Sequence, residues 1–186
     1  MKSKGGRGAR QRILDAAAEL FYREGINATG VERLAAESSV SKRTLYQHFP
    51  SKTAVVEEYL RSIEDRVASP LHGADQTPRE RLLAVFEAPT AHVGPLRGCP
   101  FHNAAVEAAG GMPGVQEIVR ASKRSFIDGL AELAKQAGAT DPQLLGNELG
   151  VLYEGAAALA TSLDDCSPWA QARTAAETLI DQAVTH

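Results

Sequence analysis

The stretch Thr29–Lys52, TGVERLAAESSVSKRTLYQHFPSK, decides the fold of this chain. It predicts two short helices joined by a tight turn, followed by the start of a third. Thr29 and Glu32 have the spacing of a capping box, in which a hydroxyl and a carboxylate each accept a backbone N–H at the start of a helix. Ser41 is a good N-cap for the second helix. That helix must end by Phe49, because the residue before a proline is driven out of the α region.

The second helix of this stretch has one apolar face and one polar face. At about 100° per residue, Leu45 and Phe49 share the side that must pack against the rest of the domain. The side chains on the opposite side and its two flanks carry hydrogen-bonding groups: Arg43, Thr44, Tyr46, Gln47 and His48. A short polar face of this kind suits a recognition helix in the DNA major groove, where Arg reads guanine, Gln reads adenine and a Thr methyl meets thymine. The alternative is an ordinary exposed helix face.

The stretch resembles the helix-turn-helix of TetR-family transcriptional regulators, most closely in Ser41-Lys42-x-Thr44-Leu45-Tyr46-x-His48-Phe49-Pro50-Ser51-Lys52. The resemblance implies base contacts from Lys42, Arg43 and Thr44. It also implies phosphate contacts from Thr29, Tyr46, His48 and Lys52, while packing inside the domain is a second role open to Tyr46. Family members usually have Gly in the turn between the two helices, where this chain has Ser39. If that turn needs a positive φ, Ser costs about 1 kcal/mol relative to Gly.

Charge is distributed unevenly along the 186 residues. Residues 1–52 carry ten Lys and Arg against five Asp and Glu, and residues 53–186 carry ten against eighteen, so net charges of +5 and −8 make up the overall −3. A basic first part indicates a nucleic-acid partner for that part alone. Its first eight residues, 1–8, predict a flexible basic arm that either contacts DNA or is a solvated tail. We expect a DNA-binding domain over residues 1–52 and a second domain over residues 53–186.

The composition predicts an all-α chain. Hydrophobic residues make up 44% and aromatic residues only 5%, and apolar positions recur at helical spacing between Gly and Pro stops. We expect about nine helices: an N-terminal three-helix helix-turn-helix domain, then a C-terminal helical domain for ligand binding and dimerisation. Thr77-Pro78-Arg79-Glu80 repeats the capping-box pattern, with Pro at the first helical position.

Several function classes find no support in the sequence. No apolar run approaches the roughly 18 residues of a membrane span, and the basic N-terminus lacks the apolar core of a secretory signal. Cys99 and Cys166 do not form a disulfide framework, so the cytoplasm is the expected location. The histidines show no metal-ligand spacing, and no nucleophile elbow, P-loop or dinucleotide motif occurs. We expect no metal, no cofactor and no enzymatic activity.

The segment 99–107, CPFHNAAVE, predicts a short helix that begins with polar groups. The family resemblance implies that the C-terminal helices enclose a pocket for a small-molecule effector and that this helix forms part of its wall. The candidate lining residues combine apolar side chains with polar anchors: Phe86, Cys99, Phe101, His102, Asn103, Val106, Phe126 and Tyr153. The alternative is that these side chains only fill the core. A thiol at a helix N-terminus is also suited to sensing electrophiles or oxidants, unless Cys99 is buried and inert.

The last two predicted helices carry regularly spaced apolar residues, with small residues at 155–158 that permit close helix approach. The resemblance implies that this helix pair forms a four-helix dimer interface with a second copy, although internal packing explains the same periodicity. The expected function is that of a repressor, which binds a palindromic DNA operator as a homodimer and is released by the effector. A thiol-based sensor using Cys99 and a transcriptional activator of the same fold are the alternatives.

Overall fold

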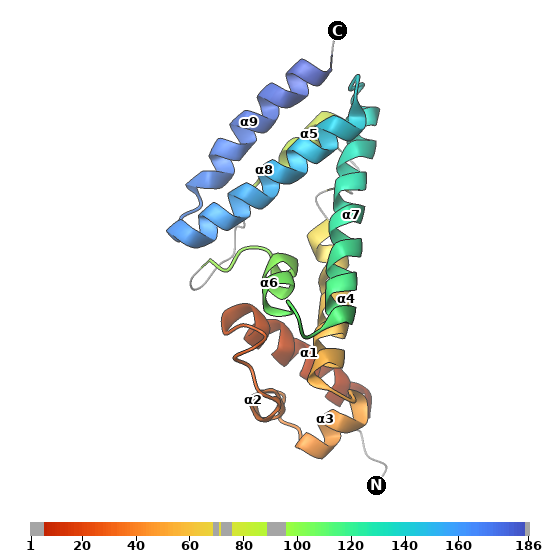
Figure 1. Cartoon of the computed structure of the whole chain (residues 1–186), viewed down its shortest axis with the longest axis vertical. Helices are drawn as coiled ribbons and strands as arrows, with labels where there is room; N and C mark the ends of the chain where they lie inside the picture. Colours follow the sequence, from red (N-terminus) through yellow and green to blue (C-terminus); the bar gives the residue numbers. More distant parts are fainter. Residues whose placement is uncertain (1–5, 69–70, 72–75, 89–95, 185–186) are drawn as a thin grey trace. The chain divides into compact units, whose positions relative to one another are not determined.

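The computed structural model of the chain describes residues 6–68, 71, 76–88 and 96–184. Within these residues there are nine α-helices and no strand, which confirms the all-α prediction (Figure 1). The helices are α1 Gly6–Arg23, α2 Val31–Glu37, α3 Lys42–His48, α4 Lys52–Ala68, α5 Pro78–Ala84, α6 Pro100–Glu107, α7 Pro113–Gln136, α8 Pro142–Leu163 and α9 Ser167–Ala183. None of the described helices is long and apolar enough to cross a membrane.

The chain divides into two compact units. The first unit comprises residues 1–63 and 100–120, and the second comprises residues 64–99 and 121–186. The division falls after Ile63, within α4, and not at the expected boundary of Lys52, where α4 begins. The first unit also gains α6 and the first turns of α7, which are distant in sequence. Helix α1 begins at Gly6, earlier than expected, and residues 1–5 of the expected arm lie outside the described residues.

The first unit is built on the packing of α1, α2 and α3. Its core consists of apolar side chains that are almost fully buried: Ile13, Leu20, Phe21, Leu34, Leu45, Phe49, Val55, Val56, Tyr59 and Leu60. The rings of Phe21 and Tyr59 meet edge to face with their centroids 5.6 Å apart. The end of α6 is fastened to the loop after α1, since the Asn27 backbone N–H donates to the Glu107 carboxylate at 2.6 Å and the Asn27 amide donates to the Glu107 carbonyl at 3.1 Å.

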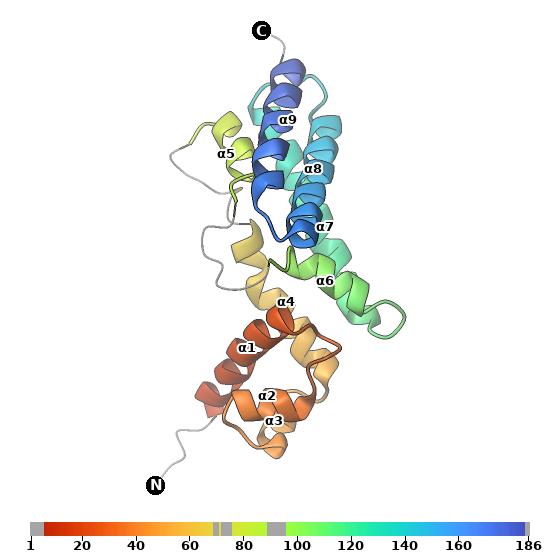
Figure 2. The ribbon, with the colours of Figure 1, turned by 90° about the vertical axis from the view of Figure 1, so that its left-hand side faces the viewer.

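The second unit contains α5, most of α7, and the antiparallel pair α8 and α9, which lie side by side in both ribbon views (Figures 1 and 2). A row of aromatic rings runs through its core: Phe126 and Tyr153 have centroids 4.8 Å apart, and Tyr153 and Trp169 have centroids 5.3 Å apart. Helices α7 and α8 approach closely at Gly146, where a Cβ atom would lie 2.8 Å from the backbone nitrogen of Ala131. Glycine is therefore required at this crossing.

Candidate nucleic-acid interface and ligand pocket

Local sequence sets both ends of α3. The Ser41 hydroxyl accepts the backbone N–H of Thr44 at 3.0 Å, which satisfies one of the free donors at the helix start. At the other end Phe49 leaves the helical region with φ −136° and ψ 115° while its N–H still donates to the Leu45 carbonyl. Both boundaries confirm the expectations from Ser41 and from the proline that follows Phe49. They set the residues at which α3 begins and ends.

One side of α3 is buried and the other is exposed. Leu45 is fully buried and Phe49 is 3% exposed. On the opposite side Lys42, Arg43, Tyr46 and Gln47 are exposed, and Thr44 and His48 are half-buried. Tyr46 keeps 48% of its surface exposed, so its ring is not a core residue of the unit. The predicted polar face is present on the exposed side of α3.

The cation at the start of α3 has an acidic neighbour. The Lys42 ammonium donates to a Glu32 carboxylate oxygen at 2.5 Å, and both side chains are exposed. This hydrogen bond raises the pKa of Lys42 and lowers the pKa of Glu32 from their ordinary values. At the start of α4, Lys52 is half-buried, and burial lowers its pKa, against an opposing effect of the nearby Glu107 carboxylate.

Thr29 does not have the role predicted for it at the start of α2. The N-cap of α2 is Gly30, and no side chain accepts a hydrogen bond there, so the predicted capping box between Thr29 and Glu32 is wrong. The Thr29 side chain is fully buried, and its hydroxyl donates to the Gly25 carbonyl at 2.7 Å. Its hydroxyl is therefore occupied in holding the loop between α1 and α2 and is not presented at the surface.

The turn between α2 and α3 requires the left-handed backbone region. Ser39 has φ 52°, and the turn is closed by hydrogen bonds from Ser39 N–H to Ala36 O at 3.1 Å and from Val40 N–H to Ala35 O at 3.0 Å. This is the conformation that glycine adopts without steric cost. The condition under which Ser39 costs stability is thus met.

The eight candidate ligand residues fall in both compact units. Phe86, Cys99, Phe126 and Tyr153 belong to the second unit, and Phe101, His102, Asn103 and Val106 belong to the first. The structure brings Phe126 and Tyr153 together in the second core. In the first unit Phe101 is buried, whereas Val106 is 64% exposed and so does not fill the core.

Cys99 is 7% exposed and has a cationic neighbour. The Lys123 ammonium, on α7, donates to the Cys99 sulfur at 3.3 Å and also forms an ion pair with Glu154 on α8. The preceding Gly98 lies against α8 with φ 66°, where a Cβ atom would lie 2.5 Å from the Thr161 hydroxyl oxygen. The close approach of this segment to α8 fixes the position of the thiol.

Tyr153 lies in the same part of the second unit as Cys99. Burial raises the pKa of its phenol well above the ordinary value, and the neighbouring groups Cys99 and Glu154 add to the rise. The phenol therefore stays protonated over the physiological range and remains a hydrogen-bond donor.

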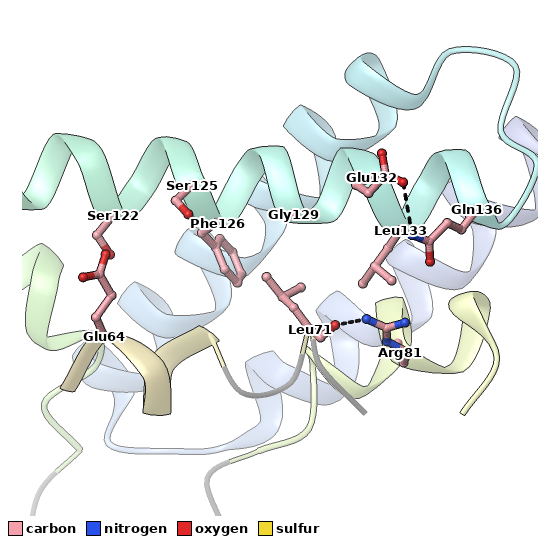
Figure 3. Close-up of a pocket in the computed structure, with 10 residues that line it drawn as sticks. All are labelled: Glu64, Leu71, Arg81, Ser122, Ser125, Phe126, Gly129, Glu132, Leu133 and Gln136. Carbon is pink, nitrogen blue, oxygen red and sulfur yellow. Dashed lines mark hydrogen bonds between the residues drawn. The ribbon is translucent and has the colours of Figure 1, made fainter. Parts of the chain in front are cut away.

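A cavity of about 290 Å³ lies elsewhere in the second unit, where the end of α4, helix α5 and helix α7 meet (Figure 3). Its lining is a mixture of charged, hydroxyl and apolar side chains: Glu64, Leu71, Arg81, Ser122, Ser125, Phe126, Gly129, Glu132, Leu133 and Gln136. Of the eight sequence candidates only Phe126 lines it. The other residues that line the cavity belong to no recognisable sequence motif. The one sequence signal that could have indicated the cavity is Gly129, a glycine in the middle of a long helix.

No group of three or more His, Cys, Asp and Glu side chains is placed to hold a metal ion within the described residues.

Comparisons with known proteins place both units in one family. The profile described as "Bacterial regulatory proteins, tetR family" matches residues 13–59, and the profile described as "Tetracyclin repressor-like, C-terminal domain" matches residues 78–176. The crystal structure of a TetR-family transcriptional regulator from Streptomyces coelicolor superposes with a TM-score of 0.84 and 28% identity, covering 96% of this chain and 97% of that one.

Curated relatives are similar over shorter segments. The HTH-type transcriptional activator FasR of Mycolicibacterium smegmatis is 38% identical over 82 residues, which are 42% of this chain and 37% of that protein. The HTH-type transcriptional repressor KstR2 of Rhodococcus jostii is 40% identical over 63 residues, 34% of this chain and 31% of that protein. The chain thus spans about a third of the length of these two relatives.

Proposed function

This chain belongs to the TetR family of bacterial regulatory proteins, and we propose that it represses transcription by binding a palindromic DNA operator as a homodimer until a small effector releases it. The family consists of DNA-binding transcriptional regulators, not enzymes. The observation that carries the proposal is the exposed polar face of α3, set opposite the buried Leu45 and Phe49. A regulator that acts on chromosomal DNA works in the cytoplasm.

The face of α3 divides into two kinds of DNA contact. Arg43, Gln47 and Thr44 are assigned to base edges in the major groove, where Arg suits guanine and Gln suits adenine. Lys42, for which the family resemblance implies a base contact, lies in the first turn of α3. The side chains of Tyr46, His48 and Lys52 are assigned to phosphates, which set register and affinity without reading sequence. Thr29 is left out of this set, because its hydroxyl is buried and donates to Gly25.

A second copy of the chain is the proposed partner for α8. Leu144, Val151, Leu159 and Leu163 are 52–73% exposed and recur at helical spacing, so they form an apolar row on one side of the helix. Large apolar side chains that remain exposed in a row indicate a surface covered by protein.

The glycines of α8 support the same assignment. Gly146 and Gly150 are explained within the subunit, because a Cβ at either would press on α7 at 2.8 and 3.1 Å. A Cβ at the exposed Gly155 would meet nothing within 4 Å, although glycine inside a helix costs about 1 kcal/mol relative to alanine. If α8 of a second subunit packs closely against this position, the absence of a side chain at Gly155 is explained.

The proposed release is a population shift. The effector binds the second unit and favours a conformation in which α4 moves and the two recognition helices no longer match successive grooves. Helix α4 is the natural carrier of this change because it runs without interruption from the first unit, at residues 52–63, into the second.

The direct test is the affinity of the full chain for its own upstream DNA, measured by fluorescence anisotropy at one stated salt concentration. We expect Arg43→Ala to weaken binding by about 1–3 kcal/mol, the value of a bidentate base contact. The matched control is Arg79→Ala, which removes an exposed arginine of α5 that pairs with Asp181 on α9. If the two variants bind equally well, α3 is not the reading helix.

A thiol sensor is the second candidate, favoured by the contact of Cys99 with Lys123. A neighbouring ammonium stabilises a thiolate, which is the reactive form. Cys99→Ser should then abolish release from DNA by an electrophile such as N-ethylmaleimide while leaving DNA affinity unchanged, and Cys166→Ser should leave the response intact. Release of the Cys99→Ser protein at the wild-type reagent concentration excludes this mechanism.

An activator of the same fold is distinguished by the direction of regulation. One relative is named an activator and the other a repressor, and both functions use a DNA-reading helix. Deleting the gene should raise expression from a reporter that carries the upstream DNA. A fall in expression identifies an activator.

A further inference from the structure

We propose that the cavity bounded by α4, α5 and α7 binds a small amphipathic carboxylate, whose single negative charge is held by Arg81. This inference rests on the proposed function, because it names the chemical class of the effector that the second unit receives. The proposed ligand is an organic acid with an apolar body, and not a neutral or cationic compound.

The hydrogen-bond partner of Arg81 does not neutralise its positive charge. Its guanidinium donates to the Leu71 backbone carbonyl, a neutral acceptor, as the dashed line in Figure 3 shows. Its Nε is fully buried and has no hydrogen-bond partner in the described part of the chain. Among the described residues no carboxylate forms an ion pair with it, in contrast to Arg79 on the same helix, which pairs with Asp181 at 2.7 Å. A half-buried cation without a counter-charge is costly, and an anionic ligand removes that cost.

The other end of the cavity has the opposite character. Glu64, at the end of α4, points toward Ser122 of α7 (Figure 3). Apolar groups from Leu71, Phe126 and Leu133 lie along the cavity between Glu64 and Arg81. A ligand carboxylate would be repelled by Glu64, so its favourable orientation places the carboxylate at Arg81 and the apolar body over the middle.

The remaining acidic residue does not neutralise Arg81. Glu132 is exposed, and its carboxylate accepts from the Gln136 amide on the next turn of α7 at 3.1 Å. The lining therefore has one cation and two carboxylates, Arg81 against Glu64 and Glu132. Arg81, the single cation of the lining, can offset one negative charge, and the two carboxylates disfavour a doubly charged phosphate ester. The guanidinium fork matches a planar carboxylate.

The size of the cavity restricts the ligand further. Its volume of about 290 Å³ is at the lower end of the range for ligand pockets, roughly 300–1,000 Å³. Gly129 contributes to that space, since a Cβ there would lie 2.8 Å from a terminal methyl of Leu71. A medium-chain carboxylic acid is a suitable probe of this size and polarity.

The experiment compares three probes of equal chain length on the full-length protein by isothermal titration calorimetry at pH 7: octanoate, octanol and octylamine. We expect octanoate to bind at least about tenfold more tightly than the other two, since a hydrogen bond to a charged group contributes about 1.5–3 kcal/mol. Tighter or equal binding of octanol or octylamine overturns the inference, and so does the absence of octanoate binding.

Two substitutions separate the charge from the cavity. Arg81→Gln removes the positive charge but keeps a polar amide, and it should lower octanoate affinity about tenfold while changing octanol affinity little. The matched control Arg79→Gln should leave octanoate affinity unchanged. Gly129→Val narrows the cavity and should weaken both probes. Equal loss of octanoate affinity in the Arg81 and Arg79 variants would show a general surface-charge effect and contradict the proposal.

The wild-type comparison of the three probes needs no variant, so it remains decisive if Arg81→Gln fails to fold. Binding of upstream DNA without any probe is measured in parallel. If DNA binds and octanoate does not, the inference fails while the proposed regulator stands. If DNA does not bind, the proposed function itself fails, whatever the probes do.

Discussion

Helices α3 and α8 each bury one face, and they differ in the chemistry of the face they leave exposed. On α3 the exposed groups are charged, phenolic and amide side chains, beside the fully buried Leu45. On α8 the exposed groups include Val151 and Leu159, beside the fully buried Leu149. The first face remains compatible with water and with a hydrated polyanion. The second loses free energy in water and gains it when another protein covers it.

This contrast separates two functions that the chain must combine. A single recognition face of seven helical residues, Lys42–His48, reads only a few base pairs, and pairing through α8 supplies the second half-site reader. Substitutions in α8 should therefore alter both the mass of the assembly in solution and its DNA affinity. Substitutions on the exposed face of α3 should alter DNA affinity alone.

The largest effect is expected from a charge placed in the apolar row of α8. Leu159→Glu removes two half-exposed leucines from a two-fold interface and brings two carboxylates into it. We expect the dimer dissociation constant to rise by about a hundredfold or more, from lost apolar burial and the cost of unpaired charge. Sedimentation velocity reports the mass, and DNA anisotropy should show a parallel loss of affinity.

Two further variants make this test specific to the row. The control Lys135→Glu reverses an exposed charge on α7, outside the apolar row, and should leave the mass of the dimer in solution unchanged. Gly155→Leu places a side chain where the subunit itself has open space and favours helix formation, so it should stabilise the monomer while weakening the dimer. A dimer that survives both Leu159→Glu and Gly155→Leu pairs through another surface.

The next effect concerns a residue that supports α3 without belonging to its reading face. Thr29→Val keeps the shape of the side chain and leaves the buried Gly25 carbonyl without its hydroxyl donor. We expect a loss of about 1–3 kcal/mol in the free energy of unfolding, measured by urea denaturation, with DNA affinity unchanged at temperatures where the variant is folded. A loss of affinity at unchanged stability would return Thr29 to the phosphate-contacting set.

A smaller effect, of opposite sign, is expected at the turn. Ser39→Gly relieves a left-handed backbone conformation, worth about 1–2 kcal/mol, and loses part of that gain to the greater freedom of glycine in the unfolded chain. The net stabilisation should be about 0.5–1 kcal/mol and is read as a higher Tm. Ser39→Ala is the control, because it keeps a Cβ at φ 52° and should give no gain.

The capping boxes show how far the sequence could predict this structure. Thr77 and Glu80 have the same spacing as Thr29 and Glu32, yet only the first pair forms the box. Pro78 begins α5 directly after Thr77, whereas Gly30 intervenes before α2 and frees the Thr29 hydroxyl to bond Gly25. Local patterns with one low-energy solution, such as Ser41 before α3, were predictable.

The sites of the second unit could not be predicted in the same way. Arg81 of α5 and Ser122 and Gly129 of α7 line one cavity only because the fold brings these segments together, and nothing in their spacing along the chain predicts it. The amphipathic pattern of a helix predicts which of its faces is buried, but it does not predict which other helices pack against that face. The face of α3 was accessible to sequence analysis because one helix carries all of it, while the cavity is shared among segments distant in sequence.

The smallest effect is expected from the ion pair that Lys42 of α3 forms with Glu32 in the absence of DNA. Lys42 pairs with the exposed Glu32, and a contact with DNA requires Lys42 to leave this carboxylate. Glu32→Gln removes the competing charge and should raise DNA affinity by a few-fold at low salt, with the difference shrinking as salt screens both interactions. Glu37→Gln, at the end of α2, is the matched control, since Glu37 pairs with Arg33 and not with α3. The readout is anisotropy across a salt series, and equal gains in both variants would mean that net charge alone, and not the release of Lys42, controls the affinity.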